Sequence, residues 1–249
     1  MTEHVIVERR GALNVVRMNR PDKKNAITRA MYASMAAALK AGDEDAEIRC
    51  HVILGVPGAF SSGNDLMDFL AVAQGADSGT AVWDFLSSLA AAKKPIVSGA
   101  DGIAVGIGTT IHLHCDLTFA TPRTEFRTPF VDLALVPEAG SSLLAPALMG
   151  RQQAFALLAL GEGFSADRAL AAGLIYKVVS ETDLEAEVFA GAERVASKPP
   201  EALRIARELM LGRRNKIIDR IKEEGSAFRE RLKSDEARQA FMAFMARKK

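Results

Sequence analysis

The feature that most constrains the fold is an alternation of short apolar runs with helix-like segments over the first two-thirds of the chain. Residues 50–56 and 95–100 are apolar almost throughout, which is typical of strands buried on both faces of a sheet. Apolar residues recur with helical spacing over residues 28–40 and 80–92, and Thr28 has the residue type and position of an N-cap. Strands that alternate with helices predict an α/β fold with a largely parallel sheet.

The last third of the chain differs, because helical periodicity dominates from about residue 182 onward. The dipeptide Pro199-Pro200 separates two of the expected helices, and Gly212 separates the next pair. A chain of 249 residues, 49% of them apolar, has the size of one globular domain. We therefore expect a core over residues 1–195 and a C-terminal helical region over residues 196–249 that belongs to the same domain.

The composition excludes several classes of function. The 32 basic residues nearly balance the 31 acidic ones, so the chain lacks the basic excess that nucleic-acid binding requires. No apolar run approaches the ~20 residues of a membrane helix, and residues 1–11 lack the apolar core of a secretory signal. Cys50 and Cys115 lie far apart without metal-ligand spacing, which favours a reducing compartment and no bound metal. We expect a cytoplasmic protein that binds neither nucleic acid nor membranes.

Two loops of small residues, each following a predicted strand, are candidates for chemistry. They span residues 59–66 and 102–108. Backbone N–H groups at such turns are unpaired and can face an anion. If the loops converge, they form an oxyanion hole in which each donor lowers a reaction barrier by roughly 3–4 kcal/mol. The alternative for the first loop is an ordinary strand-to-helix connection capped by Asn64 or Asp65. The second loop fails the dinucleotide pattern G-x-G-x-x-G after Gly108.

Glu138 is the candidate general base. It stands near Phe130 and other apolar residues, and an apolar pocket raises the pKa of a carboxyl group. The alternative is that a helix begins at Pro137 and that Glu138 stabilises its dipole from the first turn. His112 and His114 are two residues apart on a predicted helix, so they do not share a face. Core packing is therefore a better interpretation of both histidines than metal binding.

Five motifs in order resemble the crotonase family, also called the enoyl-CoA hydratase/isomerase superfamily. The resemblance covers about residues 4–246. It implies a ββα spiral core with a C-terminal α-helical subdomain and a homotrimer or dimer of trimers. It also implies an acyl-CoA thioester substrate, with no metal or other cofactor. The motifs are Asn19-Arg20-Pro21 with Asn25-Ala26, Phe60-Ser61-Ser62-Gly63-Asn64-Asp65-Leu66, Lys94-Pro95-Ile96-Val97, Cys115-Asp116, and Ala171-Ala172-Gly173-Leu174-Ile175.

Within this resemblance, two departures bear on the reaction. Hydratase members carry two glutamates that position a water molecule, and the matching positions here are Thr110 and Phe130. The segments Ser61 to Leu66, Phe126 to Phe130 and Pro137 to Ser142 instead resemble the Δ3,Δ2-enoyl-CoA isomerase branch, in which the single catalytic glutamate falls on Glu138. The resemblance places the two oxyanion N–H donors on Ser62 and Ile107, where Ile107 replaces a usual glycine. The positions expected to contact CoA or the acyl group are Lys24, Ala26, Ser61, Gly63, Asn64, Asp65, Leu66 and Phe130.

The sequence thus predicts an isomerase in which Glu138 moves a proton between two carbons of a thioester dienolate. Two alternatives remain open: hydration or acyl-CoA hydrolysis at the same site, and a non-catalytic acyl-CoA-binding protein. Lys23, Lys24 and the region of Arg213 are candidates for contacts with the CoA phosphates, since the net charge of +1 provides no global field. Trp83, Phe85 and Leu86 are expected either to line an acyl tunnel or to form a core helix face.

Overall fold

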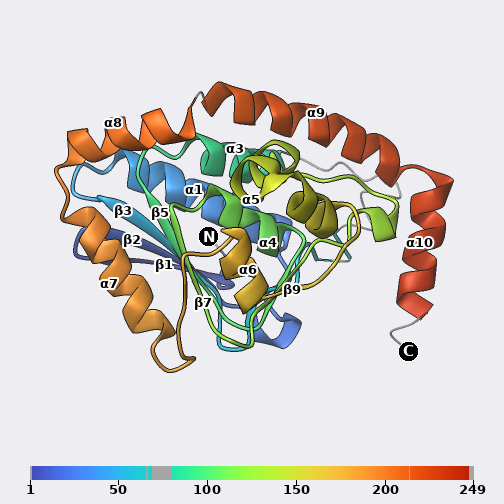
Figure 1. The fold of residues 1–249 in the computed structure, drawn as a ribbon, viewed down its shortest axis with the longest axis horizontal. Helices are drawn as coiled ribbons and strands as arrows, with labels where there is room; N and C mark the ends of the chain where they lie inside the picture. Colours follow the sequence, from blue (N-terminus) through green and yellow to red (C-terminus); the bar gives the residue numbers. More distant parts are fainter. Residues whose placement is uncertain (1, 66, 69–79, 213, 247–249) are drawn as a thin grey trace.

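A six-stranded sheet lies at the centre of the molecule (Figure 1). The computed structural model describes residues 2–65, 67–68, 80–212 and 214–246. The first two strands form an antiparallel hairpin, and all other neighbours in this sheet are parallel. In spatial order the strands are β1 (Val5–Arg10), β2 (Leu13–Met18), β3 (Cys50–Leu54), β5 (Ile96–Ala100), β7 (Leu117–Ala120) and β10 (Lys177–Val178).

Helices cover both faces of this sheet. Helices α1 (Arg29–Glu44) and α3 (Ala81–Ala91) pack on one face, toward which Ile53 points, and α7 (Leu184–Ala196) packs on the other face against Val52 (Figure 1). Side chains that alternate along a strand therefore all enter a core, which explains why the strand sequences are apolar without interruption.

A second sheet of four short strands lies beside the first. Three of its strands follow directly on a strand of the large sheet, so that a long strand, a short strand and a helical segment recur along the chain. This repetition is the predicted ββα spiral. The short strands are β4 (Ala59–Ser61), β6 (Ile103–Val105), β8 (Glu125–Arg127) and β9 (Phe164–Ser165). The helical segments between them include α4 (Ile107–Thr110), η2 (Ile111–His114), η3 (Val131–Leu133) and α5 (Ser141–Leu158).

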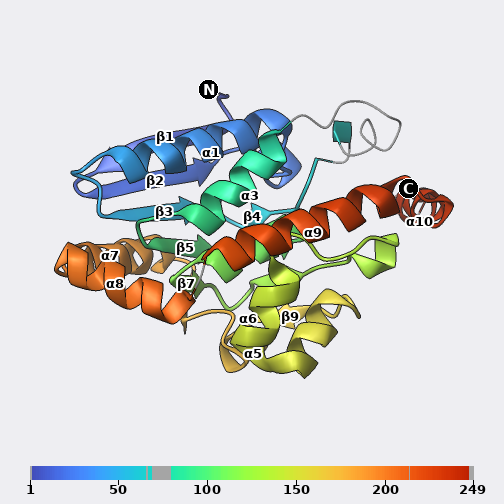
Figure 2. The same cartoon turned by 90° about the horizontal axis from the view of Figure 1, so that it is seen from above.

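The C-terminal third is helical, as expected. Helix α9 crosses the molecule between α3 and α5 (Figure 2). On α8 the buried Arg207 donates hydrogen bonds to Asp116 at 2.7 Å and to the Ala92 carbonyl at 2.6 Å, which fastens α8 to the core. No helix within the described ranges is long and apolar enough to cross a membrane. The remaining elements are η1 (Pro21–Lys23), α6 (Ala166–Ala172), α8 (Pro200–Leu211), α9 (Arg214–Leu232) and α10 (Asp235–Ala246).

Candidate active site

The two small-residue loops meet because β4 and β6 are neighbouring parallel strands. A Cβ atom on Gly63 would lie 2.9 Å from the carbonyl oxygen of Val105. A Cβ on Gly108 would lie 2.7 Å from the carbonyl oxygen of Ser61. Both distances are too short for a real side chain, so glycine is required where the loops touch. The two loops therefore lie against each other, as the oxyanion-hole hypothesis requires.

A buried asparagine fixes the shape of the turn that packs under the first loop. Asn25 has a φ of 52°, in the left-handed region that asparagine tolerates. Its amide nitrogen donates to the carbonyls of Ala59 at 3.0 Å and Phe60 at 3.1 Å, and its amide oxygen accepts the Arg20 N–H at 2.7 Å. The turn around Asn25 is thereby attached to β4.

This turn decides which backbone N–H groups remain free. The Ser62 N–H donates to the Lys24 carbonyl at 2.9 Å, so the prediction of Ser62 as an oxyanion donor is wrong for this conformation. The residues on either side of Asn64 both bond to Ile27, so the Asn64 N–H points to the opposite side. Among the described residues, neither the Asn64 N–H nor that of Ile107, the first residue of α4, has an acceptor. The free pair is therefore Asn64 and Ile107.

Glu138 lies in the loop before α5 and not in its first turn, because the helix begins at Ser141. The helix-dipole interpretation of Glu138 is therefore wrong. Glu224 of α9 takes that role, since its carboxylate accepts the N–H groups of Gly140 at 2.6 Å and Ser142 at 2.9 Å. It also accepts the Ser142 hydroxyl at 2.5 Å. No local sequence signal marks Glu224 for this role, because it is 84 residues away from Gly140.

The surroundings of Glu138 favour its neutral form. Burial raises the pKa of this carboxyl group, the hydroxyl of Thr110 lowers it by donating at 2.6 Å, and the nearby Glu224 raises it; together they bring the pKa to about 7. Burial and the proximity of Glu138 also raise the pKa of the Tyr32 hydroxyl. A carboxyl group with a pKa near neutrality can both accept and return a proton at physiological pH.

A cavity of about 170 Å³ opens beside Glu138. Asn64, Asp65 and Ala139 line it at the Glu138 end. Of the helix residues proposed for an acyl tunnel, Trp83 and Leu86 line this cavity, whereas Phe85 is fully buried. Helix α9 supplies another wall through Ile221, Gly225, Phe228 and Leu232.

The other expected contact residues lie in different surroundings. Lys24 is exposed and Ala26 is half-buried. Ser61 is fully buried, and its hydroxyl donates to the Asn25 carbonyl at 2.8 Å, so it supports the loop from within. Phe130 is 6% exposed and belongs to the core, outside the set of cavity-lining residues. Leu66 lies outside the described residues.

Both central histidines are core residues, as predicted. His112 pairs with the Ser98 hydroxyl at 2.9 Å, and His114 pairs with the Ala139 carbonyl at 2.7 Å. Burial lowers their pKa values to about 3 and about 4, respectively, so both are neutral at physiological pH. The described part of the chain holds no cluster of three His, Cys, Asp or Glu side chains suited to a metal ion.

Comparison with known sequences gives a family match over almost the whole chain. The model of the family described as enoyl-CoA hydratase/isomerase matches residues 8–249. Enoyl-CoA delta isomerase 2 from Rattus norvegicus is 35% identical over 98% of this chain, which spans only 64% of that protein's length. The peroxisomal enoyl-CoA delta isomerase 3 from Mus musculus is 32% identical over 99% of this chain and 80% of its own length. The 1,2-epoxyphenylacetyl-CoA isomerase of Escherichia coli is 28% identical over 100% of this chain and 97% of its own.

Solved structures agree with the two-sheet spiral. OdaA from Pseudomonas aeruginosa superimposes with a TM-score of 0.92 at 39% sequence identity, covering 98% of this chain and 99% of that one. An enoyl-CoA hydratase/isomerase from Pseudoalteromonas atlantica gives a TM-score of 0.93 at 35% identity, covering 98% of both chains. The predicted fold is thereby confirmed.

Proposed function

Since this chain belongs to the enoyl-CoA hydratase/isomerase family, the crotonase superfamily, we propose that it is an acyl-CoA double-bond isomerase that converts 3-enoyl-CoA into 2-enoyl-CoA. The observation that carries the proposal is the environment of Glu138. This carboxyl group lines the cavity, receives one hydrogen bond, from Thr110, and has a pKa raised to about 7. It is suited to move a proton and not to bind a cation.

The reaction follows from the placement of three groups. The thioester oxygen accepts hydrogen bonds from the N–H groups of Asn64 and Ile107. Glu138 removes a proton from C2, and the electron pair spreads over the thioester oxygen and C4 as a dienolate. Glu138 then delivers the proton to C4, which leaves the double bond between C2 and C3. The two amides stabilise the oxyanion throughout, and the step needs no redox or metal chemistry.

Isomerisation is favoured over hydration because the described carboxylates near Glu138 accept hydrogen bonds from other groups, as Glu224 does from the N–H groups of Gly140 and Ser142. Thr110 stands where the resemblance places one hydratase glutamate, and its hydroxyl donates to Glu138. The acidic groups that share the cavity are engaged elsewhere: Asp65 accepts from Arg20 at 2.6 Å, and Asp68 accepts the Arg29 N–H at 2.9 Å. The hydratase arrangement uses two carboxyl groups around one water, one to take its proton and one to protonate the substrate carbon, whereas a proton shuttle uses one.

We further propose that the CoA moiety runs over the turn that packs under the first loop. Exposed Lys24 is a local cation for a CoA phosphate, and Arg20 donates to both the Ala26 carbonyl and Asp65. The molecule's nearly neutral charge makes such local contacts necessary. CoA enters as part of the substrate, and no separate cofactor is included in the proposal.

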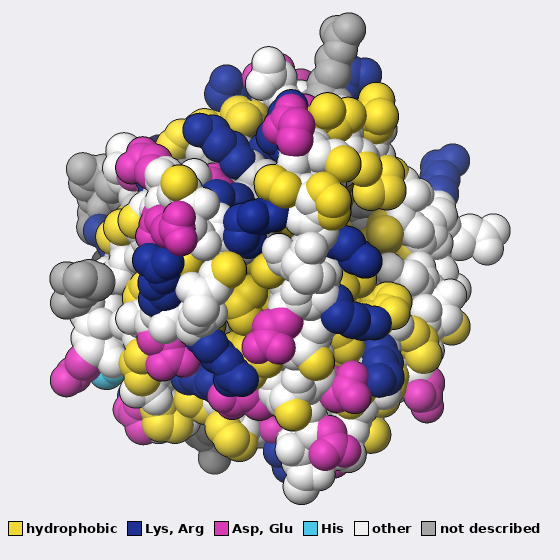
Figure 3. Space-filling model, turned by 90° about the vertical axis from the view of Figure 1, so that its left-hand side faces the viewer, with side chains coloured by type: hydrophobic (Ala, Val, Ile, Leu, Met, Phe, Trp, Pro, Cys, Tyr) yellow, Lys and Arg dark blue, Asp and Glu magenta, His cyan; other side chains and the backbone are white. Residues whose placement is uncertain are grey.

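Helix α8 supports the proposal of a homotrimer or a dimer of trimers. Leu209 and Met210 are each 79% exposed, and Ile205 is 44% exposed, whereas the buried residue of this helix is Arg207. Hydrophobic side chains gather in the upper part of the face shown in Figure 3, the end of the molecule along which α8 runs in Figure 1. Such apolar exposure is typical of a subunit contact. Sedimentation of the wild type and of Leu209→Lys tests it, and a monomeric wild type would contradict it.

A panel of CoA esters tests the proposed reaction. Purified protein is mixed with 3-enoyl-CoA and 2-enoyl-CoA esters, and the 2-enoyl thioester is followed by its absorbance. We expect conversion of 3-enoyl esters and no water addition to 2-enoyl esters. Robust hydration would contradict the argument from Thr110, and tight binding without turnover of any ester would favour a binding protein.

A further inference from the structure

Helix α9 lines the cavity with Ile221, Gly225, Phe228, Arg229 and Leu232, and four of these form a regular row in which one member has no side chain. Ile221, Gly225, Phe228 and Leu232 follow one another at intervals of four, three and four, so they share one face of the helix. Three of the four are large and apolar. Gly225 therefore forms a notch in an otherwise continuous wall.

This glycine is unfavourable for the helix itself. Gly225 lies in the interior of a 19-residue helix, where glycine is a poor helix former compared with alanine. It is not among the described residues with a positive φ, so the backbone does not require glycine there. The reason for its presence has to be sought in what an added side chain would meet.

An added side chain would meet almost nothing of the protein. The nearest atom to a Cβ on Gly225 is Nη1 of Arg229 at 3.5 Å, an ordinary van der Waals distance. Two other helical glycines differ. A Cβ on Gly191 of α7 would lie 2.8 Å from the Phe119 ring, and one on Gly42 of α1 would lie 2.5 Å from Asn14. Those two glycines are required by packing within the chain, whereas the space in front of Gly225 belongs to the cavity.

We propose that Gly225 determines acyl-chain specificity: the missing side chain leaves room for an acyl chain that extends beyond C4 between α3 and α9. The inference rests on the proposed function for the orientation of the substrate, with its reacting carbons at Glu138. Trp83 and Leu86 of α3 line the same cavity. Together with Phe228 and Leu232 they form apolar walls, which suit a hydrocarbon chain and not a polar substituent.

The test compares Gly225→Leu and Gly225→Ala with wild type on 3-hexenoyl-CoA and 3-dodecenoyl-CoA. We expect Gly225→Leu to lower the ratio of kcat/KM for the long ester to that for the short ester by about tenfold or more, as a change of a few methylene groups does in an apolar pocket. Gly225→Ala should lower the ratio less and raise Tm, because alanine favours the helix. The matched control is Ser226→Leu, which adds the same side chain at the exposed neighbouring position and should leave the ratio unchanged.

Binding measurements separate this inference from the proposed reaction. Calorimetric Kd values for hexanoyl-CoA and dodecanoyl-CoA, which are saturated and cannot react, should show the same loss of preference for the long chain in Gly225→Leu. If wild type turns over neither unsaturated ester but the binding ratio still shifts, the isomerase proposal fails and the role of Gly225 stands. An unchanged ratio in both Gly225 variants, in binding and in turnover, would overturn the role of Gly225.

Discussion

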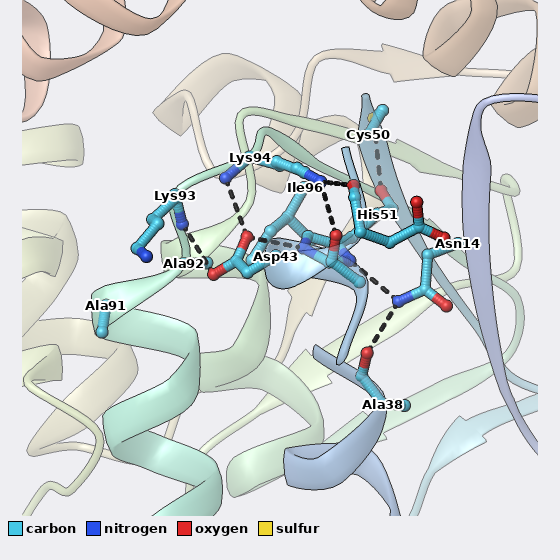
Figure 4. Close-up of polar contacts among 12 residues, drawn as sticks. Asn14, Ala38, Asp43, Cys50, His51, Ala91, Ala92, Lys93, Lys94 and Ile96 are labelled. Atoms are coloured by element: carbon cyan, nitrogen blue, oxygen red, sulfur yellow. Dashed lines mark hydrogen bonds and ion pairs between the residues drawn. The ribbon is translucent and has the colours of Figure 1, made fainter. Parts of the chain in front are cut away.

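Two partly buried carboxyl groups in this molecule have opposite surroundings and pKa values shifted in opposite directions. Asp43, near the end of α1, accepts hydrogen bonds from the backbone N–H groups of Lys93 at 2.9 Å and Lys94 at 3.1 Å and from the His51 ring at 3.1 Å (Figure 4). Burial alone would raise its pKa, but these hydrogen bonds lower it below the usual value. Glu138 has the Thr110 hydroxyl as its donor, and its pKa rises to about 7.

The different surroundings indicate a structural role for Asp43 and support the proposed catalytic role of Glu138. The cluster around Asp43 joins segments that are distant in sequence, since His51 also pairs with Asn14 of β2 at 2.9 Å (Figure 4). In this cluster, hydrogen-bond donors stabilise the charged form of the Asp43 carboxylate. Around Glu138, the described residues provide apolar walls and one donor, the Thr110 hydroxyl. Ionisation of Glu138 is therefore unfavourable, which keeps its pKa in the range suited to taking a proton from the substrate. Five predictions, in order of decreasing effect, test this contrast.

The largest effect is expected for Glu138→Gln. Glutamine keeps the size of the side chain but cannot take a proton, so kcat for a 3-enoyl-CoA should fall by about a thousandfold. An absorbance assay of wild type and variant measures this fall. The Kd for a CoA ester, measured for both proteins, should change little. Activity within a few-fold of wild type would remove Glu138 from the mechanism.

The same variant should be more stable than wild type at high pH. The folded state holds the Glu138 proton more tightly than the unfolded state, so stability falls as pH rises from about 4.5 toward about 7. Glutamine abolishes this loss, and the gain above pH 7 is up to about 3 kcal/mol. Urea unfolding at several pH values tests the sign: the two proteins should converge below the usual glutamate pKa.

Asp43→Asn should show the reverse pattern. It weakens three hydrogen bonds to a charged acceptor and leaves donors of His51, Lys93 and Lys94 poorly paired, so the free energy of unfolding at pH 7 should fall by about 2–3 kcal/mol. Because the folded pKa of Asp43 is lowered, its contribution is present above the usual aspartate pKa and is lost as pH falls through the folded value. The variant should therefore be less acid-sensitive than wild type, with kcat unchanged. A large loss of kcat in Asp43→Asn would contradict the prediction, because it would show that Asp43 also affects the reaction at Glu138.

The sequence predicted those parts of the molecule that depend on neighbouring residues. The buried parallel strands follow from their apolar runs, and Thr28 accepts the Met31 N–H as an N-cap should. Glu138 was also identified, because its apolar neighbours are close in sequence. These signals act over a few residues and need no knowledge of the tertiary fold.

The errors share a physical cause, which is a contact between distant segments. The Ser62 N–H donates to the Lys24 carbonyl. The φ of 49° at Lys24 turns that carbonyl toward the loop. The helix predicted from Pro137 begins later because Ala139 has a φ of 62°, while the carbonyl of Ala139 pairs with His114. No local pattern encodes either contact. The tertiary structure was therefore needed to identify Asn64 as the free N–H donor and to place Glu138 in the loop before α5.

Thr110→Val should move the pH dependence of the reaction upward. The Thr110 hydroxyl stabilises the ionised form of Glu138, and its removal raises the pKa further. The ascending limb of kcat/KM against pH should shift to higher pH by about one unit, with activity recovered at high pH. Thr109→Val is the matched control, because the Thr109 hydroxyl donates to the Ala104 carbonyl at 2.6 Å and not to Glu138. A limb that does not move would mean that Thr110 leaves the base unaffected.

Glu224→Gln should produce the smallest shift, in the opposite direction. Its charge raises the pKa of Glu138, so the neutral amide should move the ascending limb to lower pH by a fraction of a unit. Glutamine retains an oxygen that can accept from Gly140 or Ser142, and Tm, measured separately, reports any loss at the start of α5. The control is Glu223→Gln, which removes an exposed charge from the same helix. If both variants shift the limb equally, surface charge and not the neighbouring carboxylate sets the basicity of Glu138.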